Sequence, residues 1–386
     1  MTAPVVIVGG GPVGATLALL LAQQGIASTV LEARKQAAAY QEKRALALSF
    51  GSRRILENLG IWPALAPSAT AINSIHVSQK GSLGRSLLQA ADLNQEALGY
   101  VLSYGDLSRA LDQALSQQPL VNFLFEASAE AIRHDAALAT VTYQHQAKQQ
   151  CLGSPLLVLA DGGRGLGEIA GLSKVSKEYG HDALISKVRA ELPHANVAYE
   201  RFTEHGPLAL LPNGELEFSL VWTGKKDYVA QLMALPDSEF LRQFHQQFGD
   251  RVGQFLTVGP RMTFPLRLAQ IKVDDVAHMV LIGNAAQTMH PVAGQGFNVG
   301  LRDALALAQA IATCPRADLG NKKMLQDYQA SRRSDSKGGL LFTDFLVRVF
   351  SNDILGLPGI RSAGLGVFDV LGPIKRHLLK KMSFGK

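Results

Sequence analysis

The feature that most restricts the fold is a glycine pattern near the N-terminus, Gly9-x-Gly11-x-x-Gly14, directly after an apolar run at residues 4–8. The pattern leads into a helix-forming stretch that ends at Gly25, and a second apolar run follows. A strand, a glycine turn, a helix and another strand make a βαβ unit of a parallel sheet. The three glycines allow a tight turn, a close approach of a pyrophosphate to the backbone, and close packing of helix on strand.

The same unit carries the other groups that a dinucleotide needs. The helix N-terminus after the glycine turn favours a diphosphate. Glu32 stands 18 residues after Gly14, at the expected end of the second strand, where a carboxylate can accept hydrogen bonds from an adenosine ribose. The sequence therefore predicts dinucleotide binding by residues along this unit: Gly9, Gly11, Pro12, Val13, Gly14, Glu32, Ala33 and Arg34.

Two further apolar runs end in polar glycine turns. Residues 156–160 end at Asp161-Gly162, and residues 276–282 end at Gly283-Asn284. Parallel α/β sheets place their ligand contacts at such carboxyl ends of strands. Both turns are therefore expected to lie at the same edge of the sheet as the first glycine pattern.

A long helix is expected after the second of these turns. Gly294-Gln295-Gly296 begins it, and it runs to about Cys314. The free N–H groups at its start and the helix dipole favour negative charge above them. A reduced flavin carries such a charge at its N1–C2=O region, so this helix start is a second candidate cofactor contact.

Two regions between the apolar runs have the alternating pattern of antiparallel strands, at about residues 70–104 and 180–270. We therefore expect an α/β protein: a Rossmann-like nucleotide-binding domain with a mostly parallel, three-layer sheet, an inserted antiparallel-sheet substrate domain, and a C-terminal helical segment. The expected boundaries are 1–70, 105–180 and 271–335 for the discontinuous nucleotide-binding domain, 71–104 and 181–270 for the substrate domain, and 336–386 for the C-terminal segment.

The composition disfavours several classes of protein. Cys151 and Cys314 belong to no Cys/His spacing, so neither a disulfide framework nor a metal site is expected. The first residues lack the features of a signal peptide, and no stretch reaches the roughly 18 uncharged apolar residues of a membrane span. The expected location is the cytoplasm.

Positive charge is concentrated in the C-terminal segment. From Arg361 onward six Lys and Arg residues stand against one acid, Asp369, among many aliphatic residues. Two interpretations remain open: a basic amphipathic segment on the anionic inner face of a membrane, or a helix packed on the core with a solvated basic face. Nucleic acid binding is disfavoured, because no platform of aromatic and basic residues accompanies the charge.

The second glycine block has a fuller pattern, GNAAQTMHPVAGQGFNVGLRD at residues 283–303. It resembles the second FAD-contacting motif of the para-hydroxybenzoate hydroxylase type of flavoprotein monooxygenase, and more narrowly that of the ubiquinone-biosynthesis hydroxylases. Segments at 44–49, 69–78, 200–212 and 219–222 resemble the same subgroup. The resemblance therefore covers about residues 4–335.

The resemblance implies FAD as the cofactor and NAD(P)H as a transient electron donor. It assigns Arg44 to the FAD diphosphate or the flavin edge and Asn284 to the ribityl chain. It places His290, Pro291 and Gln295 at the wall of the ring where oxygen is activated, so these three are the catalytic candidates. The remaining expected FAD contacts on this basis are Asp161, Gly162, Gly283, Pro291, Gly294, Gln295, Gly296, Phe297 and Asn298.

The chain departs from the family pattern at two places. The family motif Asp-Gly-x-x-Ser-x-x-Arg reads here as DGGRGLGE at residues 161–168, without the Ser and with Glu in place of the final Arg. FAD contact through Asp161 and Gly162 is retained, but a role of this segment in NAD(P)H binding is not carried over. Arg109 is out of register with the usual Arg-x-x-Leu motif, so no role is transferred to it either.

The implied reaction is the O2-dependent hydroxylation of a prenylated phenol, 2-polyprenyl-6-methoxyphenol, in ubiquinone biosynthesis through a flavin C4a-hydroperoxide. Because the cofactor supplies the reactive centre, no protein nucleophile or metal is required. Three alternatives stay open: another ring hydroxylase of the pathway, an FAD-dependent reductase of a prenyl substrate, and a weakly active FAD-binding scaffold within a complex of ubiquinone-biosynthesis proteins.

Some side chains have two interpretations. His290 either takes a phenolic proton or serves as a structural hydrogen-bond partner, and His76 and His205 are equally open. Aromatic residues of the expected antiparallel sheet either form the floor of a substrate site or belong to its core. The candidates are Tyr199, Phe202, Phe218 and Trp222.

Overall fold

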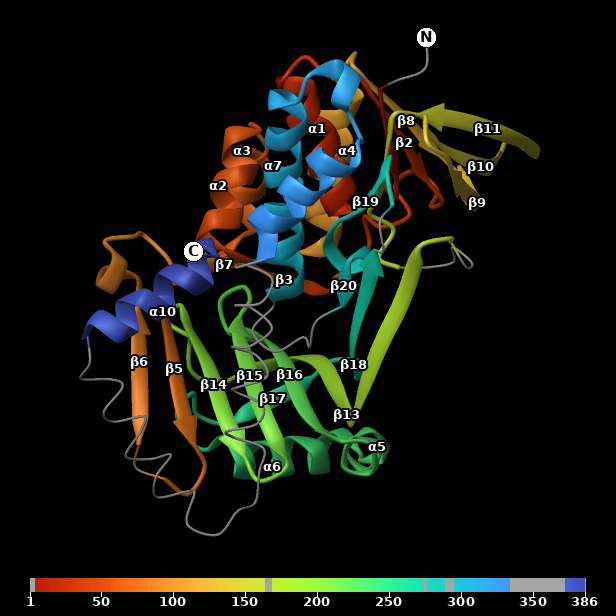
Figure 1. The fold of residues 1–386 in the computed structure, drawn as a ribbon. Helices are drawn as coiled ribbons and strands as arrows, with labels where there is room; N and C mark the ends of the chain where they lie inside the picture. Colours follow the sequence, from red (N-terminus) through yellow and green to blue (C-terminus); the bar gives the residue numbers. More distant parts are fainter. Residues whose placement is uncertain are drawn as a thin grey trace.

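The computed structural model describes residues 4–82, 84–163, 169–273, 276–288, 295–333 and 372–385, and all structural statements refer to these residues. Figure 1 shows a parallel sheet with its helices in the upper half and a larger sheet in the lower half. The α/β class and the mixture of parallel and antiparallel sheets expected from the sequence are confirmed.

The parallel sheet has the strand order β19-β12-β1-β2-β8. Its β1 and β12 are continuous apolar runs that are buried along their whole length, as expected for strands covered on both faces. The strands are β1 (Val5–Val8), β2 (Ser28–Glu32), β8 (Val121–Phe125), β12 (Leu156–Leu159) and β19 (Met279–Leu281).

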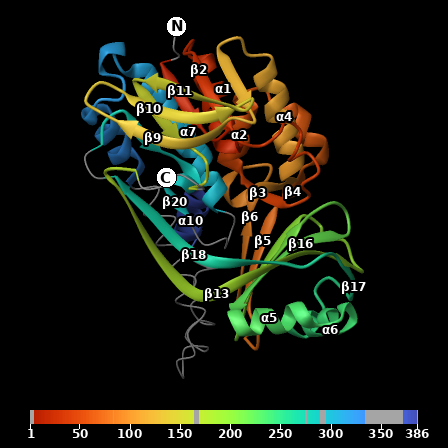
Figure 2. The ribbon, with the colours of Figure 1, turned by 90° about the vertical axis from the view of Figure 1, so that its right-hand side faces the viewer.

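Two different layers cover this sheet. Three helices, α1 (Pro12–Gln23), α4 (Tyr104–Ser116) and α7 (Gln295–Thr313), pack on one face in the largest apolar cluster. A three-stranded antiparallel sheet packs on the other face through a second cluster. It lies in front of the helices in Figure 2. Its strands are β9 (Ser128–His134), β10 (Ala139–His145) and β11 (Lys148–Ser154).

A small antiparallel sheet connects the upper and lower halves. It has the order β3-β7-β4, with β3 (Ala45–Ser49), β7 (Gly99–Ser103) and β4 (Thr70–Ile72). Helix α2 (Phe50–Asn58) follows β3 directly. Ser49, the last residue of β3, caps the helix by accepting a hydrogen bond from the Ser52 backbone N–H. Three short helical turns lie nearby: α3 (Trp62–Leu65), η1 (Ala66–Ser68) and η2 (Ala90–Leu93).

The large sheet has the order β20-β18-β13-β16-β15-β14-β5-β6, and β17 pairs with β13. All its pairs are antiparallel except β14 with β5, which come from two segments far apart in the chain. Its strands are β5 (Ser74–Gln79), β6 (Arg85–Gln89), β13 (Leu172–Ala190), β14 (Val197–Thr203), β15 (Gly206–Pro212), β16 (Glu217–Lys225), β17 (Phe255–Val258), β18 (Met262–Val273) and β20 (Gln287–Thr288). Since β13 and β18 run through positions 180 and 270, the predicted domain boundaries fall inside continuous strands, and the division into domains stays a prediction.

The two faces of the large sheet have different partners. Helices α5 (Lys226–Ala234) and α6 (Asp237–Phe248) pack on one face, which we call the outer face (Figure 2). The opposite face, the inner face, carries Ala198, which packs with Ile72 of β4 and Val101 of β7. The inner face is therefore the one directed toward the small sheet and the nucleotide-binding half.

The C-terminal helix α10 (Gly372–Phe384) packs on the body of the protein (Figure 1). Its Leu379 is buried with Leu88 of β6, and Phe384 meets the Phe50 ring of α2 edge to face at 6.2 Å. Lys375 forms an ion pair of 3.0 Å with Asp92. Of the two interpretations of the basic tail, packing on the core therefore holds for α10, while residues 334–371 lie outside the described part.

No helix in the described ranges combines the length and the apolar character that a bilayer crossing requires.

Candidate cofactor site

The first glycine turn is compact on one side and open on the other. Gly9 has φ +101°, and a Cβ there would lie 2.6 Å from Cα of Asp161. A Cβ on Gly14 would lie 2.0 Å from the carbonyl oxygen of Gly9, so helix α1 and strand β1 can pack only with glycine at this position. At Gly11, by contrast, the nearest atom to a Cβ would be Oη of Tyr104 at 3.9 Å. Because no side chain caps the start of α1, its first N–H groups are available to an anion at this open side.

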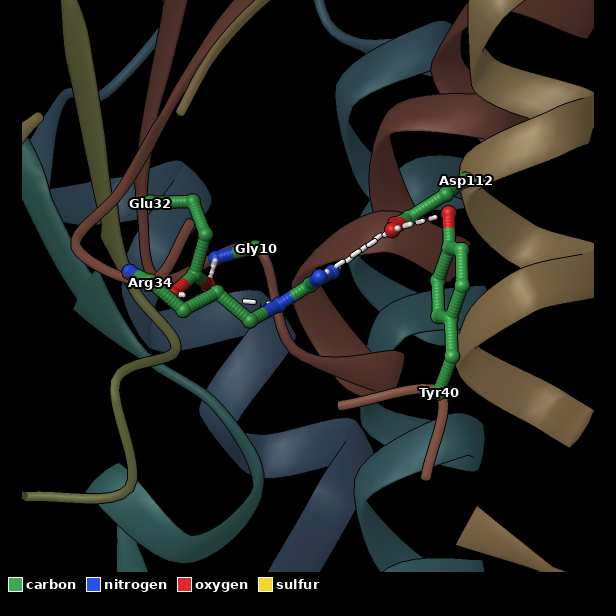
Figure 3. A network of polar contacts seen from close by, with 5 residues as sticks. All are labelled: Gly10, Glu32, Arg34, Tyr40 and Asp112. Atoms are coloured by element: carbon green, nitrogen blue, oxygen red, sulfur yellow. Dashed lines mark hydrogen bonds and ion pairs between the residues drawn. The ribbon is translucent and has the colours of Figure 1, made fainter. Parts of the chain in front are cut away.

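Glu32 holds the glycine turn in place. Its Oε2 accepts a hydrogen bond of 2.7 Å from the Gly10 backbone N–H, and its Oε1 accepts one of 2.8 Å from the Arg34 backbone N–H (Figure 3). Each carboxylate oxygen has a second lone pair. The same side chain can therefore order the turn and accept hydrogen bonds from ribose hydroxyls.

Arg34 is fixed by a carboxylate that the sequence did not single out. Its Nη1 and Nη2 donate hydrogen bonds of 3.0 and 2.8 Å to Asp112 of α4, which also accepts one of 3.1 Å from Tyr40 Oη (Figure 3). Burial lowers the pKa of Arg34, but the hydrogen bond and charge of Asp112 outweigh it and raise that pKa above its ordinary value. A signal was present, because Asp112 lies on the buried face of an amphipathic helix with Leu107, Leu111 and Leu115.

The two glycine turns that are distant in sequence lie next to each other. Gly283 has φ +59°, and a Cβ on it would lie 3.3 Å from Cγ1 of Val13. A Cβ on Gly300 of α7 would lie 2.7 Å from Cγ2 of the same valine. Asn284 also adjoins the start of α7, since its Oδ1 would be 3.4 Å from a Cβ on Gly296. The starts of α1 and α7 therefore face one common site.

The turn after β12 belongs to the same group. A Cβ on Gly163 would lie 3.6 Å from the carbonyl oxygen of Asn284. Asp161 accepts a hydrogen bond of 3.0 Å from the Gly163 backbone N–H, and Gly162 has φ +75°. The three turns predicted to contact the cofactor are thus contiguous, although the segment that departs from the family motif, residues 164–168, lies outside the described part.

Asp303 and Asn298 anchor the second turn from helix α7. Asp303 is buried, and its Oδ2 accepts a hydrogen bond of 3.1 Å from the Gly283 backbone N–H, while its Oδ1 accepts one of 2.8 Å from Arg332 Nε. Asn298 Oδ1 accepts a hydrogen bond of 2.8 Å from the Ser49 N–H, and its Nδ2 donates one of 2.9 Å to the Ala47 carbonyl. The amide of Asn298 thus connects α7 to β3, and its predicted contact with the cofactor stays a prediction.

Arg44 lies beside the open side of the first glycine turn. Its guanidinium is 4.7 Å from the centre of the Tyr104 ring and 3.0 Å from Glu42 Oε1. Burial raises the pKa of Tyr104, although the Arg44 charge lowers it. Since Tyr104 Oη is the atom closest to the open side of Gly11, Tyr104 is a further candidate contact that the sequence did not indicate.

The remaining predicted residues are placed as follows. His290, Pro291 and Gly294 lie outside the described residues, as does the side chain of Gln295, so their roles stay predictions. Ala33 follows β2 directly, and Phe297, in the first turn of α7, packs against the main apolar cluster.

The aromatic substrate candidates divide between the two faces of the large sheet. Phe218 and Trp222 are fully buried in the outer-face cluster with α5 and α6, and Tyr199 meets Phe248 of α6 there at 5.2 Å. Phe202 is also buried, but it lies on the inner face, because it is separated from Ala198 by an even number of residues along β14. The role of all four in substrate binding stays a prediction.

The two histidines left open by the sequence have aromatic contacts on the outer side. His76 lies 5.8 Å from the Tyr199 ring, and His205 stacks at 3.9 Å on Tyr228. Burial first, and then the charges of nearby arginines, lower the pKa of His76. Neither histidine belongs to the group of glycine turns.

The three turns fit FAD. The open side of Gly11 admits a diphosphate to the backbone, two helix starts direct N–H groups at the site, and Glu32 supplies acceptors for the ribose. Bound there, FAD would supply the redox chemistry of oxygen transfer, while the chain binds, orients and shields the reacting groups.

Comparison with known proteins agrees with this geometry. Residues 2–339 match the model of the FAD binding domain family. The chain is 36% identical over 98% of its length to the ubiquinone hydroxylase UbiL of Rhodospirillum rubrum, covering 89% of that protein. It is 29% identical to the 3-demethoxyubiquinol 3-hydroxylase of Escherichia coli, with 97% of each chain covered.

The fold is also that of known enzymes of this kind. The crystal structure of p-nitrophenol 4-monooxygenase PnpA from Pseudomonas putida matches 99% of the chain with a TM-score of 0.78, at 18% identity and with 98% of that chain covered. Taken with the three contiguous turns, these similarities make the chain a member of the FAD binding domain family and an FAD-dependent hydroxylase.

Proposed function

We propose that the chain hydroxylates the ring of a prenylated phenol in ubiquinone biosynthesis, with NAD(P)H as electron donor and O2 as the source of the oxygen atom. The observation that carries this proposal is the 36% identity to a ubiquinone hydroxylase along nearly the whole chain. The substrate proposed in particular is 2-polyprenyl-6-methoxyphenol, as the sequence motifs indicate.

The inner face of the large sheet supports such a substrate. Its strands present Val77 of β5, Ala209 of β15 and Val221 of β16 on one side, because paired residues of neighbouring strands share a face. These side chains are apolar, and a prenylated ring is mostly hydrocarbon. A surface of this kind, on the face whose Ala198 packs against the small sheet, suits a hydrophobic aromatic ligand.

Turnover by the FAD-loaded protein tests the proposal. With short-chain prenylated phenols, NAD(P)H oxidation should accelerate, O2 should be consumed in step, and the product should be heavier by one oxygen atom. Acceleration without oxygen incorporation would instead identify a reductase of a prenyl substrate. No acceleration with any prenylated phenol would identify an FAD-binding scaffold.

A second candidate is hydroxylation at another position of the same ring. It is favoured by the likeness to the Escherichia coli relative, whose name specifies a 3-hydroxylase of a demethoxyubiquinol. Offering phenols that differ in which ring positions are blocked, and locating the new hydroxyl by NMR, separates the two candidates.

Peripheral contact with the inner face of the membrane, from the cytoplasm, is part of the proposal, as is association with other ubiquinone-biosynthesis proteins. Helix α10 supports the first, because Arg376, His377 and Lys380 are exposed while Leu379 is buried against the body. An anionic bilayer attracts such a basic helix face.

A further inference from the structure

Glu200 is a carboxylic acid whose immediate neighbours on its face of the sheet are apolar. It lies on β14, paired with Val77 of β5 on one side and Ala209 of β15 on the other. Along its own strand, Ala198 and Phe202 share its face. This is the inner face of the large sheet, because Ala198 packs against Ile72 and Val101 of the small sheet.

Charged groups on the elements around Glu200 are engaged elsewhere. On β14, Arg201 points to the outer face, where it donates hydrogen bonds to the Gln247 carbonyl and Ser78 Oγ. On α10, which packs near β5, Lys375 is paired with Asp92. Strand β15 contains no titratable residue, and His76 of β5 lies on the outer face beside Tyr199.

The Glu200 carboxylate therefore has no ionic or hydrogen-bonding partner within the described ranges. Burial alone raises its pKa to about 7. Glu200 is partly buried, and a carboxylate that loses part of its hydration without gaining a partner weakens the fold, so the acid is not explained by the stability of the sheet. A ligand that donates a hydrogen bond would satisfy it.

We propose that Glu200 binds the aromatic substrate by accepting a hydrogen bond from its phenolic hydroxyl. The inference rests on the proposed function and adds a substrate-binding residue to it. A phenol matches both parts of this surface, since its ring and prenyl chain can lie on Val77 and Ala209 while its hydroxyl meets the only acid on these strand segments. Such a hydrogen bond also raises the electron density of the ring at the positions that accept oxygen.

Binding measurements on the FAD-loaded protein test this without turnover. The probes are 2-prenylphenol and its methyl ether, 2-prenylanisole, which has the same shape but no hydroxyl proton. Binding is followed through the change in flavin absorbance. A hydrogen bond to a charged acceptor corresponds to roughly tenfold or more in affinity, so at a pH above the pKa of Glu200 the wild type should prefer the phenol by at least that factor.

Two substitutions at Glu200 and one control define the result. Glu200→Leu should remove the preference for the phenol and leave the binding of the ether nearly unchanged. Glu200→Gln, which retains an uncharged acceptor and the same shape, should keep part of the preference. Glu204→Leu, at an exposed side chain just beyond the end of β14, should leave the preference intact.

The pH dependence gives an independent readout. In the wild type, phenol binding should strengthen as pH rises through about 7, because the deprotonated carboxylate is the better acceptor. The rise should be absent in Glu200→Gln.

The outcomes separate this inference from the proposed function. If the wild type binds and hydroxylates the phenol but Glu200→Leu keeps the full preference for it over the ether, the role of Glu200 is refuted and the function stands. If the FAD-loaded wild type binds neither probe and turns over no prenylated phenol, both are refuted.

Discussion

Gly300 of α7 and Val13 of α1 are in such close contact that a Cβ on the glycine would lie 2.7 Å from Cγ2 of the valine. The same Cβ would lie 3.2 Å from Cα of Gly283. Three segments that are predicted to contact the cofactor therefore meet at one point. The distance between the two helix starts, and with it the width of the FAD site, is set by the absence of a side chain at position 300.

Replacing Gly300 by Ala should push α7 away from α1. Overpacking of this kind typically costs about 1–3 kcal/mol of stability. Because the displaced helix begins at the cofactor site, FAD affinity should fall together with the melting temperature. Fluorescence titration of the FAD-free protein with FAD and thermal unfolding measure the two effects.

A compensating change distinguishes this contact from general damage. Val13→Ala removes both γ-methyls, so the double variant with Gly300→Ala should recover part of the lost FAD affinity. Gly259→Ala is the matched control, since a Cβ there would meet only ordinary contacts, the nearest at 3.6 Å. Equal FAD affinity in Gly300→Ala and the wild type would show that the contact between Gly300 and Val13 does not determine the width of the FAD site.

The buried pair between Arg34 and Asp112 should contribute strongly to both stability and FAD binding. Asp112 is 2% exposed in its side chain, and its removal leaves the Arg34 guanidinium without its two hydrogen bonds. Asp112→Ala should therefore lower the free energy of unfolding by about 3 kcal/mol and weaken the binding of FAD. Urea unfolding measures the first effect and fluorescence titration the second.

The control is the exposed pair of Lys323 and Asp327, whose side chains are 84% and 71% exposed. Asp327→Ala should change the free energy of unfolding by no more than about 0.5 kcal/mol. Similar losses of unfolding free energy in the two variants would mean that burial does not strengthen the ion pair of Arg34 with Asp112.

The glycine turns and the parallel strands could be predicted from sequence because their signals are local. Gly9 adopts a φ of +101° within its own turn, and a Cβ on Gly14 would meet the carbonyl oxygen of Gly9 in that same turn. The contact of Gly300 with Val13 and the bond from Asp303 to Gly283 join distant segments. A single sequence carries no direct signal for such pairs, although the repeated glycines of the second block restrict where close packing can occur.

The faces of the large sheet were harder to predict for a physical reason. Alternation shows that Phe218 and Trp222 lie on the same side of β16, but it does not show which side faces the cofactor. Helix α6 could have indicated which side is covered, since Phe240, Phe244 and Phe248 recur every four residues and form an aromatic face that must pack against a partner. The sequence does not mark Glu200 as a site residue, because a single acid in a strand usually reaches solvent.

The pKa of Glu200 makes the stability of the protein depend on pH. The folded protein keeps the Glu200 proton up to about pH 7, whereas the ordinary value is 4.5, so the folded state binds more protons between these limits. Its stability should therefore decrease as pH rises from about 4.5 to 7 and then level off. Glu200→Gln should be more stable than the wild type at pH 8, by about 1–3 kcal/mol, with a much smaller difference at pH 4.5.

Thermal unfolding of the FAD-loaded protein across this range, without phenol, checks the expectation. Glu204→Gln is the control, because the Glu204 side chain is 65% exposed and lacks the burial on which the expected effect at Glu200 depends. A Glu200→Gln variant that is no more stable than the wild type at pH 8 would mean that the carboxylate is solvated.

The packing of α10 allows membrane attraction to be tested without removing the helix. Arg376 and Lys380 are exposed, so reversing both charges should leave the buried Leu379 contact and the melting temperature unchanged. Each basic residue near an anionic surface contributes about 1 kcal/mol to membrane attraction. In a flotation assay, markedly less of the Arg376→Glu, Lys380→Glu variant than of the wild type should therefore bind anionic vesicles. Neither protein should bind neutral vesicles.

A second variant, Lys148→Glu with Arg316→Glu, changes the net charge by the same amount at exposed positions outside α10. It should partition like the wild type, because the attraction depends on where the charge lies and decays within about 10 Å at 0.1 M salt. Equal losses in the two variants would attribute flotation to overall charge. Unchanged flotation in the α10 variant would exclude its exposed basic face as the contact, and a prenylated substrate would then have to reach the inner face of the large sheet by another route.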